Sequence, residues 1–151
     1  MTTTNDKSTA TAIHLSALTQ YCIPFGNFIF PVLLWSTLKG KSEYINSQGK
    51  QSINFQLSLF LYTILLAVIA VPIFIINVLK GIEFSEMHRN SDFFVQNFDP
   101  GNVSTIVVVG IIAVLSFIFL KVIEFFLIIY AALKTSNGEN YKYPMTISFL
   151  K

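Results

Sequence analysis

Charged residues are scarce in this sequence. Only 12% of its 151 residues are Asp, Glu, Lys or Arg, and the net charge is +2, whereas a soluble domain carries about 25% charged residues. Hydrophobic residues reach 53% and the mean hydropathy is +0.62. This composition excludes a disordered chain, which needs low hydrophobicity and high net charge, and it offers no basic patch for nucleic acid. It predicts a small integral membrane protein in contact with the lipid bilayer.

Cysteine and catalytic motifs are also scarce. Cys22 is the only cysteine, which excludes an internal disulfide and a multi-cysteine metal site. His14, which we expect near a helix start, and His88 stand in different segments outside any metal-spaced cluster. The sequence has no Gly-rich phosphate loop and no Gly-x-Ser-x-Gly elbow. We therefore expect no catalytic residues, no metal site, no cofactor and no enzymatic activity.

Three long apolar stretches, residues 13–38, 53–79 and 103–133, dominate the rest of the chain. Each exceeds the roughly 20 residues that cross a hydrocarbon core of about 30 Å. Because backbone polar groups in lipid must be satisfied within the segment, these stretches should be helical. The sequence predicts an all-α, polytopic transmembrane protein with a broken first helix and two long helices. Residues 13–151 would form one domain after a solvated polar tail, residues 1–12, which lacks the pattern of a signal peptide.

The first apolar stretch contains residues that interrupt helices. Proline removes a backbone donor, and Gly-Asn is common turn chemistry. We expect two half-length helices, about residues 9–22 and 28–38, which form either a kinked span or a hairpin that re-enters the membrane. The predicted helix-break residues are Pro24, Gly26, Asn27 and Pro31.

The second stretch carries polar residues on one helical face. Gln51, Asn54, Ser58 and Tyr62 follow i, i+3, i+7, i+11 spacing, which places them on one side of a helix. Amides and hydroxyls in a membrane find partners between helices, so this stripe should face protein. It would serve either interhelical contact or, in the alternative, a polar path.

The third stretch contains the only ionisable pair within an apolar stretch, Lys121 and Glu124. Their i, i+3 spacing makes them neighbours, and each alone would cost about 2.5–3.5 kcal/mol at the membrane centre. They mark either a functional site or a packing contact near the interface, where Lys can reach water. A helix of 31 residues would extend about 46 Å, so it should protrude or break. The same face carries a predicted packing or partner surface, Gly110, Ala113 and Phe117.

Loop charges predict the orientation. Residues 39–52 contain three lysines and the C-terminal tail three more, while residues 80–102 contain four acids against two cations. The positive-inside rule then places loop 39–52 and the C-terminus in the cytoplasm. The amphipathic segment 80–102 would be external, and a plasma (inner) membrane location follows. A hairpin would place the N-terminus inside and a kinked span outside; the severity of the break favours inside.

Several sequence blocks resemble a family of small bacterial membrane proteins of unknown function, grouped with the Tic-Twenty-like proteins. The most specific are Pro-Phe-Gly-Asn at residues 24–27 and Tyr-Pro-x-Thr-Ile at 143–147. Residues 14–18, 49–56, 131–134 and 137–142 extend the similarity, together with Pro31 and Trp35. The resemblance implies a helical membrane domain, and the chloroplast relatives are subunits of a protein-import channel.

Two functions remain open from the sequence. The first is a non-enzymatic accessory subunit that packs against another membrane protein of a larger complex, for example machinery for protein translocation or insertion. The alternative is a homo-oligomeric channel or carrier whose polar path contains Lys121, Glu124 and the stripe from Asn54 to Tyr62. The first is preferred, because a chain with two or three spans is small for a pore.

Overall fold

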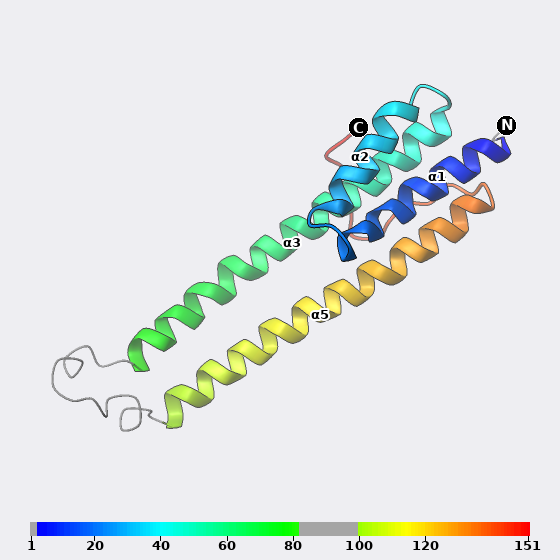
Figure 1. Ribbon diagram of the computed structural model, residues 1–151. Helices are drawn as coiled ribbons and strands as arrows, with labels where there is room; N and C mark the ends of the chain where they lie inside the picture. Colours follow the sequence, from blue (N-terminus) through cyan, green and yellow to red (C-terminus); the bar gives the residue numbers. More distant parts are fainter. Residues whose placement is uncertain (1–2, 82–99) are drawn as a thin grey trace. The chain divides into compact units, whose positions relative to one another are not determined.

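Helices make up all the regular structure in the described part of the chain (Figure 1). The computed structural model describes the backbone of residues 3–81 and 100–151, and the side chains of residues 3–76 and 107–151. The elements are α1 (Thr4–Ser16), the 3₁₀ helix η1 (Ala17–Tyr21), α2 (Gly26–Leu38), α3 (Glu43–Gly81) and α5 (Pro100–Ser136). The predicted all-α class is confirmed. The segment 80–102, predicted to be external and amphipathic, lies almost wholly outside the described residues.

The N-terminal residues form a helix where the sequence analysis expected a solvated tail. Thr3 and Asp6 make a reciprocal capping box, with Asp6 N–H donating to Thr3 Oγ1 at 3.2 Å and Thr3 N–H donating to Asp6 Oδ2 at 3.0 Å. Such a box satisfies two of the free donors at a helix start. Ala10 and Ile13 are fully buried on the inner face of α1. The polar composition of residues 4–12 therefore reflects the outer face of a packed helix.

The predicted break in the first stretch is confirmed, with boundaries that differ from the expectation. The chain tightens into η1, turns at residues 22–25 and restarts as α2. Phe25 has a positive φ of 60° at the turn. Gly26 approaches Thr19 so closely that a Cβ would lie 2.6 Å from the Thr19 hydroxyl. Pro31, expected with the break, lies inside the continuous helix α2.

Two helices are long and apolar enough to cross a membrane. In the described residues these candidate spans are Glu43–Ile76 of α3 and Val107–Ser136 of α5. Helix α5 runs unbroken for 37 residues, or about 55 Å, so it exceeds the bilayer core without breaking. Helix α2, with 13 residues, measures about 20 Å and is too short to span.

The chain divides into two compact units. Unit 1 comprises Met1–Leu61 and Leu120–Lys151. Within it, α1 lies beside the last turns of α5 and α2 beside the first turns of α3 (Figure 1). Its apolar core joins η1, α3, α5 and the C-terminal tail, with Ala17, Phe55, Ile128, Ala131 and Tyr143 all buried. The rings of Phe55 and Tyr143 stack at 4.0 Å between centroids.

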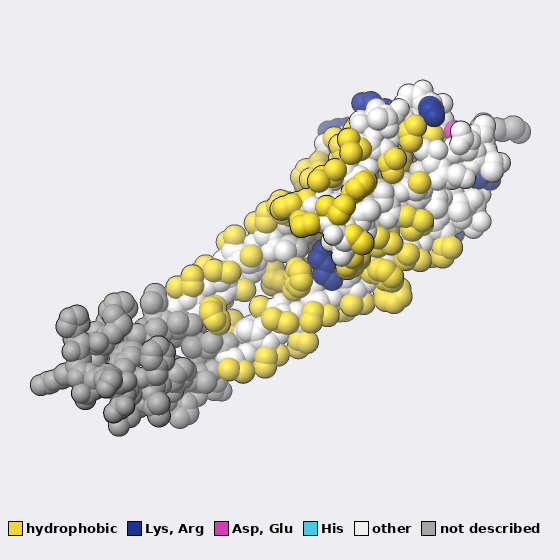
Figure 2. All heavy atoms as spheres, in the orientation of Figure 1, with side chains coloured by type: hydrophobic (Ala, Val, Ile, Leu, Met, Phe, Trp, Pro, Cys, Tyr) yellow, Lys and Arg dark blue, Asp and Glu magenta, His cyan; other side chains and the backbone are white. Residues whose placement is uncertain are grey.

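Unit 2 comprises Tyr62–Phe119. Among its described side chains, residues 62–76 and 107–119, none is buried. Large apolar residues such as Ile69 and Val68 are 62% exposed. Hydrophobic side chains of this kind cover the helix surfaces visible in Figure 2. Contiguous apolar exposure on this scale fits a lipid-facing surface.

Candidate functional site

The candidate functional site is a closed polar triad in unit 1, formed by Gln20, Lys121 and Glu124. Lys121 Nζ donates to Glu124 Oε2 at 2.8 Å and to Gln20 Oε1 at 2.9 Å. Gln20 Nε2 donates in turn to Glu124 Oε1 at 2.8 Å. Both carboxylate oxygens and both amide atoms are thus engaged within the chain. The predicted neighbourhood of Lys121 and Glu124 is realised as an ion pair.

The position of the triad follows from two elements. Lys121 and Glu124 come from consecutive turns of α5, so their side chains meet on one face. Gln20 comes from η1, where the tighter 3₁₀ turn precedes the chain reversal. Glu124 is 1% exposed, whereas the Lys121 side chain is 34% exposed. A buried carboxylate is costly without partners, and here it has both a cation and an amide.

A second polar cluster joins α1, α3 and the C-terminal tail around His14. The His14 Nδ1 lies 2.9 Å from the Tyr143 hydroxyl, and Nε2 lies 3.3 Å from the Gln48 amide. When the Gln48 amide nitrogen donates to His14 Nε2 and to the Tyr141 carbonyl, its oxygen accepts from the Tyr141 N–H. Nδ1 then carries the proton and donates to Tyr143. His14, expected near a helix start, is fully buried near the end of α1.

Burial controls the protonation of His14 and Tyr143 in this cluster. Both residues lie outside the two candidate spans. Loss of hydration lowers the pKa of His14 to about 4. The same cause raises the pKa of Tyr143 well above its ordinary value. Because burial penalises the charged form of each group, both are neutral at pH 7. The cluster therefore acts as a neutral hydrogen-bonded anchor for the tail.

Asn54 and Ser58, from the predicted polar stripe, bind the C-terminal tail. Asn54 Nδ2 donates to the Leu150 carbonyl at 3.0 Å, and Asn54 Oδ1 accepts from the Leu150 N–H at 2.8 Å. The Ser58 hydroxyl accepts from the Ile147 N–H at 2.8 Å and donates to the Asn54 carbonyl at 2.7 Å. Both side chains are buried, as expected for a stripe that faces protein. Tyr62, the next residue of the stripe, is half-buried in unit 2.

The other predicted residues separate into two groups. At the helix break, Asn27 Nδ2 donates to Gln56 Oε1 on α3 at 2.8 Å, and Pro24 lies in the turn. In unit 2, Gly110 and Ala113 are half-buried and Phe117 is 42% exposed. A Cβ at Gly110 would meet no atom within 4 Å, so this face has room for a partner side chain or for lipid.

Sequence reasoning missed Gln20, Gln48 and Tyr143 as members of these clusters. Gln20 and Lys121 are 101 residues apart, and no local pattern links them. One available signal was the presence of an uncharged amide within an otherwise apolar stretch, since such a group needs a partner in a membrane. Among the side chains of residues 3–76 and 107–151, no three His, Cys, Asp or Glu residues gather as potential metal ligands.

Comparison with known proteins identifies a family. No curated protein matches the chain, and no solved structure matches it. A family model described as the magnetosome magnetite crystal formation protein family matches residues 5–150. The similarity to small bacterial membrane proteins is thus correct at that level, while the Tic-Twenty-like assignment is a wrong one and its link to protein translocation is not supported. Because the match covers nearly the whole sequence, the chain belongs to the magnetosome magnetite crystal formation protein family.

Proposed function

We propose that this protein is a non-enzymatic accessory subunit of a membrane assembly that takes part in magnetite crystal formation. The description of its family supports the role in crystal formation. The two apolar candidate spans support residence in a membrane. The accessory role rests on the chemistry of the buried polar groups, and above all on the closed triad.

The closed triad is the observation that carries the accessory role. An ion path needs groups that exchange their partners with a passing ion. Glu124 instead uses both oxygens on Lys121 and Gln20, and Gln20 uses both amide atoms. Such an arrangement suits a contact that fixes η1 against α5. A protein whose ion pair only holds η1 against α5 would act in crystal formation through contacts between its outer surface and a partner.

The exposed face of unit 2 is the surface we assign to a partner. It includes the half-buried Gly110 and Ala113, and small residues let a neighbouring helix approach closely. Lipid can cover the rest of the apolar surface. The predicted partner is therefore another membrane protein of the same assembly that packs a helix on Gly110 and Ala113.

Copurification and crystal size test this proposal together. The chromosomal gene in a magnetite-forming host would be replaced by a tagged Gly110→Leu variant. We expect loss of the copurifying partner in mild detergent, and smaller or fewer crystals by electron microscopy. Gly40→Leu is the matched control, because a Cβ at Gly40 also meets no atom within 4 Å.

The two readouts separate the parts of the proposal. If Gly110→Leu retains its partner, this contact face is wrong. If deletion of the gene leaves crystals unchanged, the role in crystal formation is wrong even when the partner is found.

The alternative of a channel or carrier is tested by flux in liposomes. This alternative depends on Lys121, because its side chain is one-third exposed and is the part of the triad that a passing ion would meet. If Glu124→Gln changes ion flux while the protein stays folded, the triad belongs to a transport path and the accessory role is overturned.

A further inference from the structure

The hydrogen bonds of unit 1 show that residues 4–38 form a hairpin. At one end, Lys7 of α1 donates to the Asn137 carbonyl at the end of α5, at 3.3 Å. The Tyr44 hydroxyl, in the first turn of α3, donates to the Glu139 carbonyl at 2.9 Å. The start of α1, the connection from α2 to α3 and the end of α5 therefore lie at the same end of the unit.

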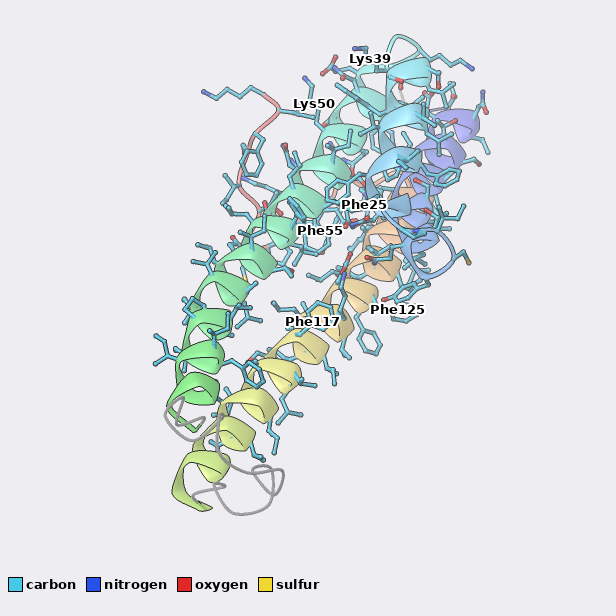
Figure 3. All side chains as sticks on the ribbon, turned by 60° about the vertical axis from the view of Figure 1, so that its left-hand side comes forward. Phe25, Lys39, Lys50, Phe55, Phe117 and Phe125 are labelled. Carbon is cyan, nitrogen blue, oxygen red and sulfur yellow. The ribbon has the colours of Figure 1, made fainter. Side chains whose placement is uncertain are left out.

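The turn of the hairpin lies at the opposite end of α2. Gln20 contacts Glu124 just before the turn, and Asn27 contacts Gln56 just after it. Figure 3 shows Phe25 at this turn and Lys39 at the other end of α2. The first arm of the hairpin, α1, thus begins at the end that contains loop 39–42, and the second arm, α2, finishes at that same end.

The contact with Glu124 gives the depth of the turn. Glu124 lies nine residues before Leu133, the last residue of the third apolar stretch. At 1.5 Å per residue this is about 14 Å, or roughly half of a hydrocarbon core of about 30 Å. A turn at this level is inside the apolar layer and does not reach its far side.

The surface of the turn is apolar. Tyr21, Ile23 and Phe25 are 59%, 46% and 66% exposed. The Tyr21 ring meets the Phe125 ring of α5 edge-on, with centroids 6.4 Å apart, and Phe125 belongs to a candidate span. The exposed apolar surface of the turn is therefore continuous with the lipid-facing surface of α5.

Three backbone N–H groups of the turn have partners within the chain, which lowers the cost of an apolar environment. The N–H groups of Cys22 and Ile23 donate to the Thr19 carbonyl, and the Gly26 N–H donates to the Ile23 carbonyl. Pro24 has no N–H to satisfy. Irregular backbone within a membrane is tolerated only when its polar groups have partners. Phe25 keeps an unfavourable positive φ, and its side chain is 66% exposed.

From these observations we infer that this hairpin is re-entrant: its residues 17–38 lie in the apolar layer of the membrane, with Ile23 and Phe25 at the tip in contact with lipid acyl chains. It enters the membrane from the side that contains loop 39–42 and the end of α5. The N-terminus is consequently on that same side. This inference concerns insertion and does not depend on the proposed role in crystal formation.

The native Cys22 is a built-in probe of the tip. It is the only cysteine in the sequence and it is exposed, so a nitroxide label needs no other substitution. In lipid nanodiscs, we expect the label to collide more with dissolved oxygen, which concentrates in acyl chains, than with a water-soluble nickel chelate. The control is Cys22→Ser with Lys41→Cys, in the loop, where the nickel chelate should dominate. Equal nickel accessibility at residues 22 and 41 would overturn the inference.

The side of the N-terminus is tested separately. Cys22→Ser combined with Asn5→Cys, and Cys22→Ser combined with Lys41→Cys, place one thiol at each exposed position. A membrane-impermeant maleimide should label both from the same face in spheroplasts and inverted vesicles. Labelling from opposite faces would show a kinked span and overturn the hairpin. Neither result bears on crystal formation, so the two proposals fail independently.

Discussion

The two units contain segments of the same two long helices, yet they are stabilised by different means. Unit 1 buries His14, Gln48, Asn54, Ser58 and Glu124 and supplies each with a partner from another segment. None of the described side chains of unit 2 is buried. Buried polar groups are costly unless they are paired, so unit 1 is defined by specific contacts. Unit 2 relies on the bilayer, and single substitutions should therefore have much larger effects in unit 1.

The largest effect is expected from Glu124→Leu in unit 1. This variant leaves Lys121 and the Gln20 amide without their carboxylate, and breaking a buried pair costs about 3–5 kcal/mol. The matched change in unit 2 is Leu115→Ala, at a residue 60% exposed, with an expected effect within about 0.5 kcal/mol. Unfolding of purified protein in mild detergent measures both. Similar losses in the two variants would contradict the comparison.

Acidification should weaken unit 1 through His14. Its pKa is about 4 in the folded protein and about 6.5 when exposed. Between these values the unfolded state binds the additional proton, so the free energy of unfolding falls as the pH is lowered from about 6.5 to about 4. At about 1.4 kcal/mol per unit the full loss is about 3 kcal/mol.

The His14→Gln variant isolates this contribution. Other groups titrate in both proteins, so the difference between the two stability profiles reports His14. If the difference in the free energy of unfolding between the two proteins stays constant across this pH range, folding does not lower the pKa of His14.

Alanine substitutions at Gly49 and Gly110 compare how closely the two units are packed. A Cβ at Gly49 would collide with the Trp35 side chain, and overpacking costs about 1–3 kcal/mol. A Cβ at Gly110 has open space, and replacing Gly by Ala within a helix favours the helix by about 1 kcal/mol. Gly49→Ala should therefore lower the unfolding temperature, and Gly110→Ala should leave it unchanged or raise it. A loss at Gly110 would reveal a tight contact in unit 2.

The smallest effect is expected where the tail meets α3. Ser58→Ala removes the acceptor for the Ile147 N–H, which should cost about 1 kcal/mol and make the tail more accessible to proteases. Ser116→Ala, at a half-buried hydroxyl in unit 2, should change the stability by less than about 0.5 kcal/mol. Equal protection of the tail in wild type and Ser58→Ala would show that the contacts of Asn54 and Tyr143 anchor it without Ser58.

Local patterns predicted the helices and the pairing of Lys121 with Glu124, because helical periodicity depends only on near neighbours. They also predicted the break, since Pro24 and Gly26 act on their own backbone. The tail assigned to residues 1–12 was wrong because polar composition outweighed the Thr3–Asp6 capping box and the apolar spacing of Ala10 and Ile13. That spacing was visible in the sequence.

The rest of the site depended on contacts between distant segments. Gln20 meets Glu124 across 104 residues, and Tyr143 meets His14 across 129. Periodicity shows which face of a helix is apolar, but it does not show which other segment covers that face. The sequence therefore indicated that Asn54 and Ser58 need partners in protein, and only the fold identifies the backbone of the C-terminal tail as that partner.

Unit 1 is built from two stretches that are separated in the sequence by residues 62–119, and this separation has a consequence for biosynthesis. His14, Gln20, Asn54 and Ser58 are translated early, but their partners lie between residues 121 and 150. At about 5–20 residues per second, synthesis of residues 62–119 alone takes on the order of 3–12 s. During that interval the early polar side chains must stay hydrated or be held by the insertion machinery. Unit 1 therefore cannot close until its second stretch has been made, and Leu150 must be present before the tail can close on α3.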